Sequence, residues 1–208
     1  FDERMTLYML PPRYLLLNDL GLLRNTTSEF FPDQLNAWFV NGMGSVVWAE
    51  ALQSGVKKMS PEFERAMVSA RNKKCLHKIQ SAQNKDGGYS WYRGMPSSVL
   101  CTELFFTRYL GLVECGYYRG MNFSSKMYVK ALSYLDKWIV SEYQERTKYP
   151  GTKTEVSSEV LNYLFIRSCY PDSTMDVETK RAYGGFMTDI RAGWKKYSLE
   201  AKAQVAAV

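Results

Sequence analysis

The sequence alternates between two kinds of helical segment, and this alternation constrains the fold more than any other feature. Residues 62–83 and 124–145 place apolar side chains on one side and basic ones on the other with a helical period, as in a helix with one wet face. Residues 97–113 and 156–170 are apolar almost all the way round, which is typical of a helix buried on most sides. Since no strand-like alternation of useful length occurs, the sequence predicts an all-α protein.

The alternation is accompanied by weak internal repeats. Residues 38–52 (WFVNGMGSVVWAEAL) and 91–104 (WYRGMPSSVLCTEL) share an aromatic pair, then Gly-Met, Ser, Val and a final Leu. A fainter third copy pairs Ser97-Ser98 with Ser157-Ser158, and residues 104–106 with residues 164–166. A period of roughly 50–60 residues, with one wet and one buried helix in each unit, indicates stacked helical hairpins.

Stacked hairpins with the buried helices inside and the wet helices outside form an α/α toroid. A six-hairpin ring with this period needs roughly 300 residues, so a chain that supplies about four hairpins predicts an incomplete ring, or one completed by sequence outside this chain. We expect a single domain over residues 1–208, with residues 1–23 and 172–208 as terminal hairpin pieces and a frayed tail at AKAQVAAV. Because the chain begins at Phe1 and not at Met, we expect it to belong to a longer multidomain polypeptide.

Composition argues against several classes of function. The net charge of +6 permits acidic partners, but the basic residues lie in scattered pairs that are typical of solvated helix faces, so we expect no binding to nucleic acid. No segment approaches the ~20 apolar residues of a membrane span. The four cysteines have no CxxC or Cys/His ligand spacing, so neither a metal nor a cofactor is predicted. His77 follows Cys75 by two residues, and on a helix their side chains point about 200° apart, which argues against a catalytic pair.

Residues 83–98, QNKDGGYSWYRGMPSS, join a wet helix to a buried one and allow two interpretations. As a site, the acidic residue would be an acid or ligand group in the mouth of a ring, and the aromatic pair would be a platform for a sugar or peptide. As structure, Asp bonds its own backbone, glycine supplies a positive φ, and the aromatic side chains wedge neighbouring hairpins together. The structural interpretation is favoured, and the candidate residues are Asp86, Gly87, Gly88, Tyr89, Trp91, Tyr92 and Gly94.

The longer stretch 77–117 resembles the thioester-domain region of bacterial α2-macroglobulin-like proteins. In that region a helix ends in a Gln-Asn/Ser-x-Asp/Asn-Gly-Gly-aromatic-x-Trp-aromatic-x-Gly-Met-Pro run, and a helix of the YxTxYxxxGL kind follows. The residues that carry the resemblance are Gln83, Asn84, Asp86, Gly87, Gly88, Tyr89, Trp91, Tyr92, Gly94, Met95, Pro96, Thr102 and Leu112. A bare Gln-x-x-x-Gly-Gly-x-x-Trp also occurs in terpene cyclases and other α/α toroids.

The resemblance implies a domain of a large extracytoplasmic protease trap, in the periplasm or at the cell surface of a bacterium. In that family, cleavage of a bait region triggers a conformational change, and in many members a thioester then captures the protease covalently. The domain implied is non-catalytic and binds no cofactor. Its expected partners are other domains of the same chain and target proteases, and any association with the envelope would run through regions outside residues 1–208.

The chain departs from the family at the thioester itself. The bond joins a Cys to a Gln three positions further on, in Cys-x-Glu-Gln, and none of the four cysteines here has Gln at that position. Cys101, in CTEL, comes closest, but Leu104 stands where the acyl donor must be. We therefore expect a member without a thioester, or one whose motif lies before Phe1.

The alternative is an α/α-toroid enzyme that acts on carbohydrate or isoprenoid through acidic residues at the ring mouth. Terpene cyclases use an Asp-x-Asp-Asp motif, which the sequence lacks, whereas inverting glycosidases need two carboxylates about 6.5–9.5 Å apart. The acidic candidates are Glu103, Glu155 and Glu159, with Asp86. Glu103 is the most suggestive because it lies on an apolar helix, although a structural partner, Arg108 or a neighbouring helix, is the favoured explanation.

Overall fold

A computed structural model of the chain describes residues 27–53, 69–116, 126–148, 156–169 and 175–207, and the elements in these ranges are all helices. In chain order they are α2 (Phe31–Gln53), α4 (Ser69–Ala82), α5 (Val99–Glu114), α6 (Lys126–Lys148), α7 (Ser158–Ser168), α8 (Val177–Gly193), the 3-10 helix η2 (Trp194–Lys196) and α9 (Leu199–Ala207). The prediction of an all-α protein is confirmed. The expected hairpin piece at residues 1–23, the first part of 62–83 and residues 172–174 lie outside the described residues.

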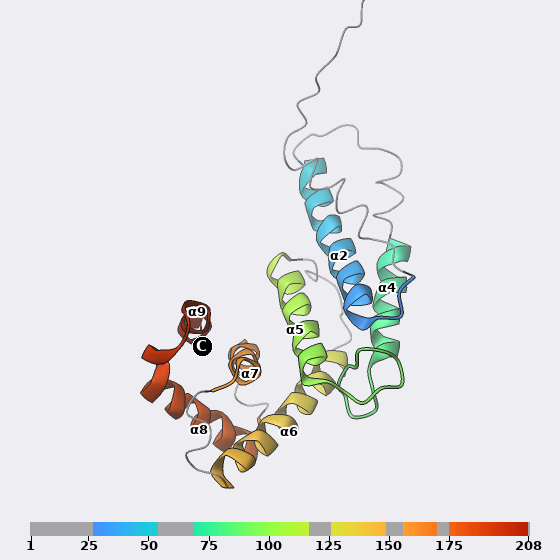
Figure 1. Ribbon diagram of the computed structural model, residues 1–208. Helices are drawn as coiled ribbons and strands as arrows, with labels where there is room; N and C mark the ends of the chain where they lie inside the picture. Colours follow the sequence, from blue (N-terminus) through green and yellow to red (C-terminus); the bar gives the residue numbers. More distant parts are fainter. Residues whose placement is uncertain (1–26, 54–68, 117–125, 149–155, 170–174, 208) are drawn as a thin grey trace, which may run out of the picture.

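The helices form two rows that the chain visits in turn. In one row α2 packs on α5, α5 on α7, and α7 on α9; the other row holds α4, α6 and α8, where α6 packs on α8. The rows are joined by contacts of α2 with α4, and of α6 with both α5 and α7. In Figure 1, α2 and α5 run side by side, whereas α7 and α9 are seen nearly end-on, so the first row turns along its length. The predicted alternation of helix types therefore corresponds to an alternation in space.

The core follows the first row, and aromatic rings hold α2 against α5. Trp38 of α2 is buried and stacks on Phe105 of α5, with ring centroids 6.1 Å apart. Phe105 also stacks on Tyr109, one turn further along α5, at 5.8 Å. Trp38 thus packs directly between α2 and α5. Because rings of this size bury large apolar areas, they contribute much of the stability of the α2–α5 contact.

Helices α4 and α6 have the amphipathic character that the sequence predicts. Ile79 of α4 and Leu135 and Ile139 of α6 are buried, whereas Lys130 and Lys137 of α6 are exposed. Both helices thus turn one apolar side to the first row and one basic side to solvent. None of the helices in the described ranges has the length and apolar character needed to cross a bilayer.

The buried helices begin at residues that suit a helix N-terminus. Ser98 accepts a hydrogen bond from the backbone N–H of Cys101 at the start of α5, and Ser157 accepts one from Val160 at the start of α7. Asp176 does the same for α8, where its Oδ1 accepts from the N–H of Thr179 at 2.7 Å. Such a cap satisfies one of the four backbone donors that a helix leaves open at its first turn.

The structure corrects the register of the internal repeats. Residues 38–52 lie within α2, whereas Trp91 and the Gly-Met at 94–95 precede α5, so these two copies are not equivalent in structure. In the third copy the caps Ser98 and Ser157 are the equivalent residues, which shifts the predicted pairing by one position. The tail predicted to fray forms helix α9 as far as Ala207. The shared Gly, Ser and aromatic residues therefore indicated the equivalent positions of the repeats less well than the capping serines did.

Helices α5 and α7 are less uniformly buried than their sequences predict. Leu100 is 49% exposed and Thr107 is exposed on α5, and Phe165 is 38% exposed on α7. On each helix the exposed residues recur three or four positions apart, or at multiples of a turn, and so form one face. The first row is thus covered by the second on one side and leaves part of its other side open.

Candidate functional site

The loop between α4 and α5 is closed by its own backbone. The N–H of Asn84 donates to the carbonyl oxygen of Gly88 at 2.9 Å, and the N–H of Gly87 donates to the carbonyl of Asn84 at 3.0 Å. Further along, the N–H of Ser98 donates to the carbonyl of Tyr89 at 2.7 Å, which forms an isolated antiparallel bridge directly before α5. The loop therefore leaves α4 through a tight, hydrogen-bonded turn and enters α5 directly after a backbone bridge.

The carboxylate of Asp86 accepts hydrogen bonds from other residues of the same loop. Its Oδ1 accepts hydrogen bonds from the N–H of Gly88 at 3.0 Å and from the hydroxyl of Ser97 at 2.7 Å. The amide of Asn84 donates to the same Ser97 hydroxyl at 2.9 Å and to the carbonyl of Met95 at 3.1 Å. This is the backbone-bonding turn expected of Asp, and these polar side chains hold the two ends of the loop together.

Two features require glycine at position 87: a positive φ and the close approach of α6. The φ of Gly87 is +97°, and a Cβ at this position would collide with the backbone carbonyl of Lys130 on α6. Gln83 strengthens the same contact, since its side-chain amide donates to the carbonyls of Gly87 and Met127, each at 2.8 Å. The first glycine of the pair thus lets the loop lie directly on α6, the helix that follows α4 in its row.

Gly88 and Gly94 differ in what surrounds them. A Cβ on Gly88 would lie 2.6 Å from the Cβ of Ser97. The two ends of the loop therefore approach too closely for a side chain at Gly88. Gly94 has a φ of +85° but open space around it. Its role is therefore conformational, in the turn that ends where the N–H of Met95 donates to the carbonyl of Tyr92.

The aromatic residues of the loop point to α2 and α5. Tyr89 is fully buried between Phe31 and Phe105, with ring centroids 4.6 and 4.8 Å apart, and burial raises the pKa of its phenol. Trp91 stacks on Phe30 at 5.8 Å, and its carbonyl accepts the N–H of Phe31 at the first turn of α2. These contacts attach the loop to the start of α2.

Tyr92 has a more open position. It also packs on Phe30, at 5.4 Å, but 49% of its surface is exposed, and Arg93, Gly94 and Met95 beside it are exposed too. Asp86 is exposed as well, so among the candidate loop residues a partner could touch Asp86, Tyr92 and Gly94 without the loop being rearranged.

A pocket of about 200 Å³ lies beside the loop, between the start of α2 and the end of α4. It is lined by Lys78 and Arg93 as cations, by Glu29 as an anion, and by the polar side chains of Gln34 and Ser90. The side-chain amide of Gln34 donates to the carbonyl of Ser28, and the hydroxyl of Ser90 donates to the carbonyl of Tyr92. Charges of both signs line this pocket, so it does not select a ligand of one charge.

Of the acidic candidates, Glu103 lies in the seam between α5 and α7. It is only 2% exposed; its Oε2 accepts from the side-chain amide of Asn162 on α7 at 3.2 Å, and its buried Oε1 has no hydrogen-bond partner in the described part of the chain. Burial raises the pKa of Glu103 to about 8, with a smaller contribution from the negative charge of Glu159. The hydrogen-bond partner of Glu103 is therefore on a neighbouring helix, the second of the two structural partners considered above, and not Arg108. Arg108 instead donates to Asn36 of α2 at 3.0 Å.

Glu159 and Glu155 are placed differently. Glu159 lies in the first turn of α7, where hydrogen bonds to its carboxylate, first from its own backbone N–H, lower its pKa. Glu155 lies outside the described residues. The structure thus brings Glu103 and Glu159 near each other at the start of α7, but it buries the first and leaves the second partly exposed.

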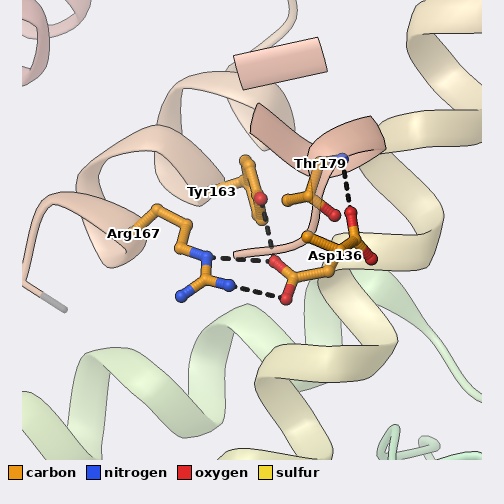
Figure 2. A network of polar contacts seen from close by, with 5 residues as sticks. Asp136, Tyr163, Arg167 and Thr179 are labelled. Atoms are coloured by element: carbon orange, nitrogen blue, oxygen red, sulfur yellow. Dashed lines mark hydrogen bonds and ion pairs between the residues drawn. The ribbon is translucent and has the colours of Figure 1, made fainter. Parts of the chain in front are cut away.

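A polar network between α6 and α7 was not singled out in the sequence (Figure 2). Arg167 is 1% exposed and donates to both oxygens of Asp136, at 3.0 Å from Nε and 2.7 Å from Nη2. The hydroxyl of Tyr163 donates to Oδ1 of Asp136 at 2.9 Å. Burial raises the pKa of Asp136, although the guanidinium and the phenol both act to lower it.

Two sequence signals could have found this network. Tyr163 and Arg167 lie four residues apart, and so on one face of α7, and Arg167 is the one cation in the largely apolar segment 156–170. Asp136 follows Leu132 by four residues and therefore shares the apolar side of α6. A charge on the buried side of each of two neighbouring helices predicts an ion pair between them.

The four cysteines are free thiols. Cys101 is fully buried, and burial raises the pKa of its thiol, which disfavours the reactive thiolate. In the described part of the chain, no group of three or more His, Cys, Asp or Glu residues is placed to hold a metal ion.

The candidate site therefore consists of a self-bonded loop with an exposed tip, and of one buried acid in the α5–α7 seam. Comparison with models of protein families, with characterised proteins and with solved structures finds no match to this chain.

Proposed function

We propose that this chain is a non-catalytic α/α-toroid domain, without a thioester, of an α2-macroglobulin-like protease inhibitor or envelope defence protein. Its role is conformational: the domain docks on other domains of the same polypeptide and contributes surface to the capture of a protease outside the cytoplasm. The observation that carries the proposal is the loop at residues 83–98, in which the Asn, Asp, glycine and aromatic residues of the family resemblance shape the loop or attach it to the helices.

The arrangement of the helices supports the toroid. Helices from the two rows alternate along the chain, and within the first row α2 contacts α5, α5 contacts α7, and α7 contacts α9. Further hairpins added with the same alternation would extend the turning row seen in Figure 1 toward a ring.

The chemistry of the cysteines supports the absence of a thioester. At Cys101, the closest position, the residue three places on is Leu104, which has no acyl group to offer. The buried carboxyl of Glu103 likewise favours a non-catalytic role, because a substrate cannot touch a side chain that is 2% exposed.

A comparison of large and small substrates tests the proposal. The polypeptide that contains this chain is incubated with proteases of different specificity, and hydrolysis of casein and of a short chromogenic peptide is followed. We expect casein hydrolysis to fall at least tenfold while the peptide is still cleaved, because a trapped protease keeps its active site but is shielded from large substrates.

Two controls complete this test. Prior treatment with methylamine, and the substitution Cys101→Ala, should leave trapping unchanged, because neither a thioester nor this thiol takes part. Equal loss of casein and peptide hydrolysis would indicate blockage of the protease active site instead, and no protection against any protease would contradict the proposal.

A further inference from the structure

The carboxyl of Glu103 is buried, and no cation among the described residues forms an ion pair with it. Its two oxygens lie in the seam between α5 and α7, where one accepts the amide of Asn162 and the other has no hydrogen-bond partner within the described ranges. Asn162 donates the same hydrogen bond to a charged or an uncharged carboxyl. The amide therefore does not supply the positive charge that a buried carboxylate needs.

The charged groups on the helices around α5 do not supply that charge either. On α7 the nearest charge is Glu159, which is negative and disfavours a second negative charge beside it. On the α2 side, Arg108 donates to Asn36 and lies over the ring of Phe39. On the α6 side, Asp136 is paired with Arg167. Among the described residues, none of the cations forms an ion pair with Glu103.

We propose that Glu103 is a proton-dependent latch between α5 and α7: the packed seam holds Glu103 in its protonated form, and ionisation of this carboxyl drives the two helices apart. In the closed seam the proton removes the need to bury a bare charge. In the open seam water solvates the carboxylate, so a rise in pH favours opening.

The direction of the effect follows from the two protonation equilibria. In the closed seam the pKa of Glu103 is raised to about 8, whereas in the open, hydrated seam it returns to its ordinary value near 4.5. Between these values the open state loses the proton and the closed state keeps it, so the opening equilibrium rises roughly tenfold per pH unit. The stabilisation by the proton is complete below pH 4.5, and it is lost by about pH 8.

Opening of this seam would reach the second half of the molecule. Helix α7 packs on α9, and through Tyr163 and Arg167 it is bonded to Asp136 of α6. A shift of α7 away from α5 therefore acts on α6 and α9, the helices to which α7 is attached. The latch works on the chain itself and does not depend on the proposed function.

Hydrogen exchange across pH tests the latch. The 208-residue chain, its variant Glu103→Gln and the control Glu159→Gln are compared between pH 5 and pH 8, with each rate corrected for the intrinsic pH dependence of exchange. In the unsubstituted chain we expect the opening equilibrium of amides in α5 and α7 to rise roughly tenfold per pH unit. In Glu103→Gln it should stay flat, because the glutamine amide is neutral at every pH, and Glu159→Gln should keep at least half of the slope.

A second measurement does not depend on a substituted protein. The 13C chemical shift of the Glu103 carboxyl, followed in the unsubstituted chain, should titrate near pH 8 and not near pH 4.5. A titration near 4.5 would overturn the proposal. So would equal pH slopes of exchange in the unsubstituted chain and in Glu103→Gln. If Glu103→Gln does not fold, the carboxyl titration alone decides.

Discussion

Among single residues, Gly87 and Gly94 separate two reasons for which a loop can require glycine. Both have a positive φ, but only Gly87 lies against another backbone, the carbonyl of Lys130 on α6. The first glycine thus serves both the turn and the packing of the loop on α6, whereas the second serves the turn alone.

We expect Gly87→Ala to destabilise the chain more than Gly94→Ala. The left-handed backbone costs an alanine about 1–2 kcal/mol at either position. At Gly87 the collision with Lys130 adds at least about 1 kcal/mol, because a backbone carbonyl cannot rotate away as a side chain does. Urea unfolding of the two variants measures the difference, and equal losses would show that the loop does not rest on α6.

The self-bonding of this loop could be predicted from sequence, because Asp, Asn and Gly act on backbone only a few residues away. Its attachment could not. The contacts of Gln83 with Met127 and of Tyr89 with Phe31 join positions far apart in the chain, and neither residue type specifies such a partner.

Between elements, the packing of α8 on α6 depends on one of two adjacent glycines. Gly184 is exposed, with no neighbouring atom where a Cβ would lie. At Gly185 an added Cβ would overlap the ring of Tyr143 on α6, which itself meets Phe186 edge-on at 5.6 Å. The absent side chain at Gly185 is therefore what lets the two helices approach.

Substitution of Gly184 and of Gly185 by alanine can be compared within one helix. Gly184→Ala should stabilise the chain by about 0.5–1 kcal/mol, because alanine is the better helix former. Gly185→Ala gains the same propensity but must displace Tyr143, which should cost about 1–3 kcal/mol. Thermal unfolding of both variants reads out the opposite signs, and stabilisation by both would mean that α6 and α8 do not pack at this point.

The sequence predicted where the described helices lie better than it predicted which helices are equivalent in the internal repeats. Hydrophobic period indicated α5, α6 and α7 with ends within a few residues of those observed, because each pattern is local to its helix. The copy at residues 38–52 misled, since Gly42-Met43 lies inside a helix and Gly94-Met95 in a turn. A dipeptide does not specify its conformation, whereas a capping serine at a helix start does so more strongly.

For the molecule as a whole, the Asp136–Arg167 pair ties the C-terminal half together. Arg167 of α7 bonds Asp136 of α6, and its charge also acts on Asp176, the cap of α8 (Figure 2). Three successive helices are therefore linked through one buried guanidinium. Helical spacing places Asp136 and Arg167 on the buried sides of their helices, but it does not indicate the third helix, because the approach of Asp176 to Arg167 depends on how α8 packs beside α6 and α7.

We expect Arg167→Met to cost about 3–5 kcal/mol of unfolding free energy, because it leaves the carboxylate of Asp136 buried without its cation. Urea unfolding measures the loss. Adding Asp136→Leu should recover part of it, since the unpaired charge is then removed as well. Lys148→Met breaks an exposed ion pair with Glu145 and should change stability by less than about 0.5 kcal/mol. A loss as small as that control in Arg167→Met would contradict a structural role for the pair.

The two rows of helices have a consequence for how the chain is made. Among the described helices, α5 packs on α2, α7 on α5, α8 on α6 and α9 on α7, so each of these helices packs on a helix of its own row that precedes it in the sequence. During synthesis the ribosome releases the chain N-terminal end first, at about 5–20 residues per second. Every described helix after α2 therefore emerges beside a surface that already exists, and α5 can complete a three-helix unit with α2 and α4 before α6 has emerged from the ribosome.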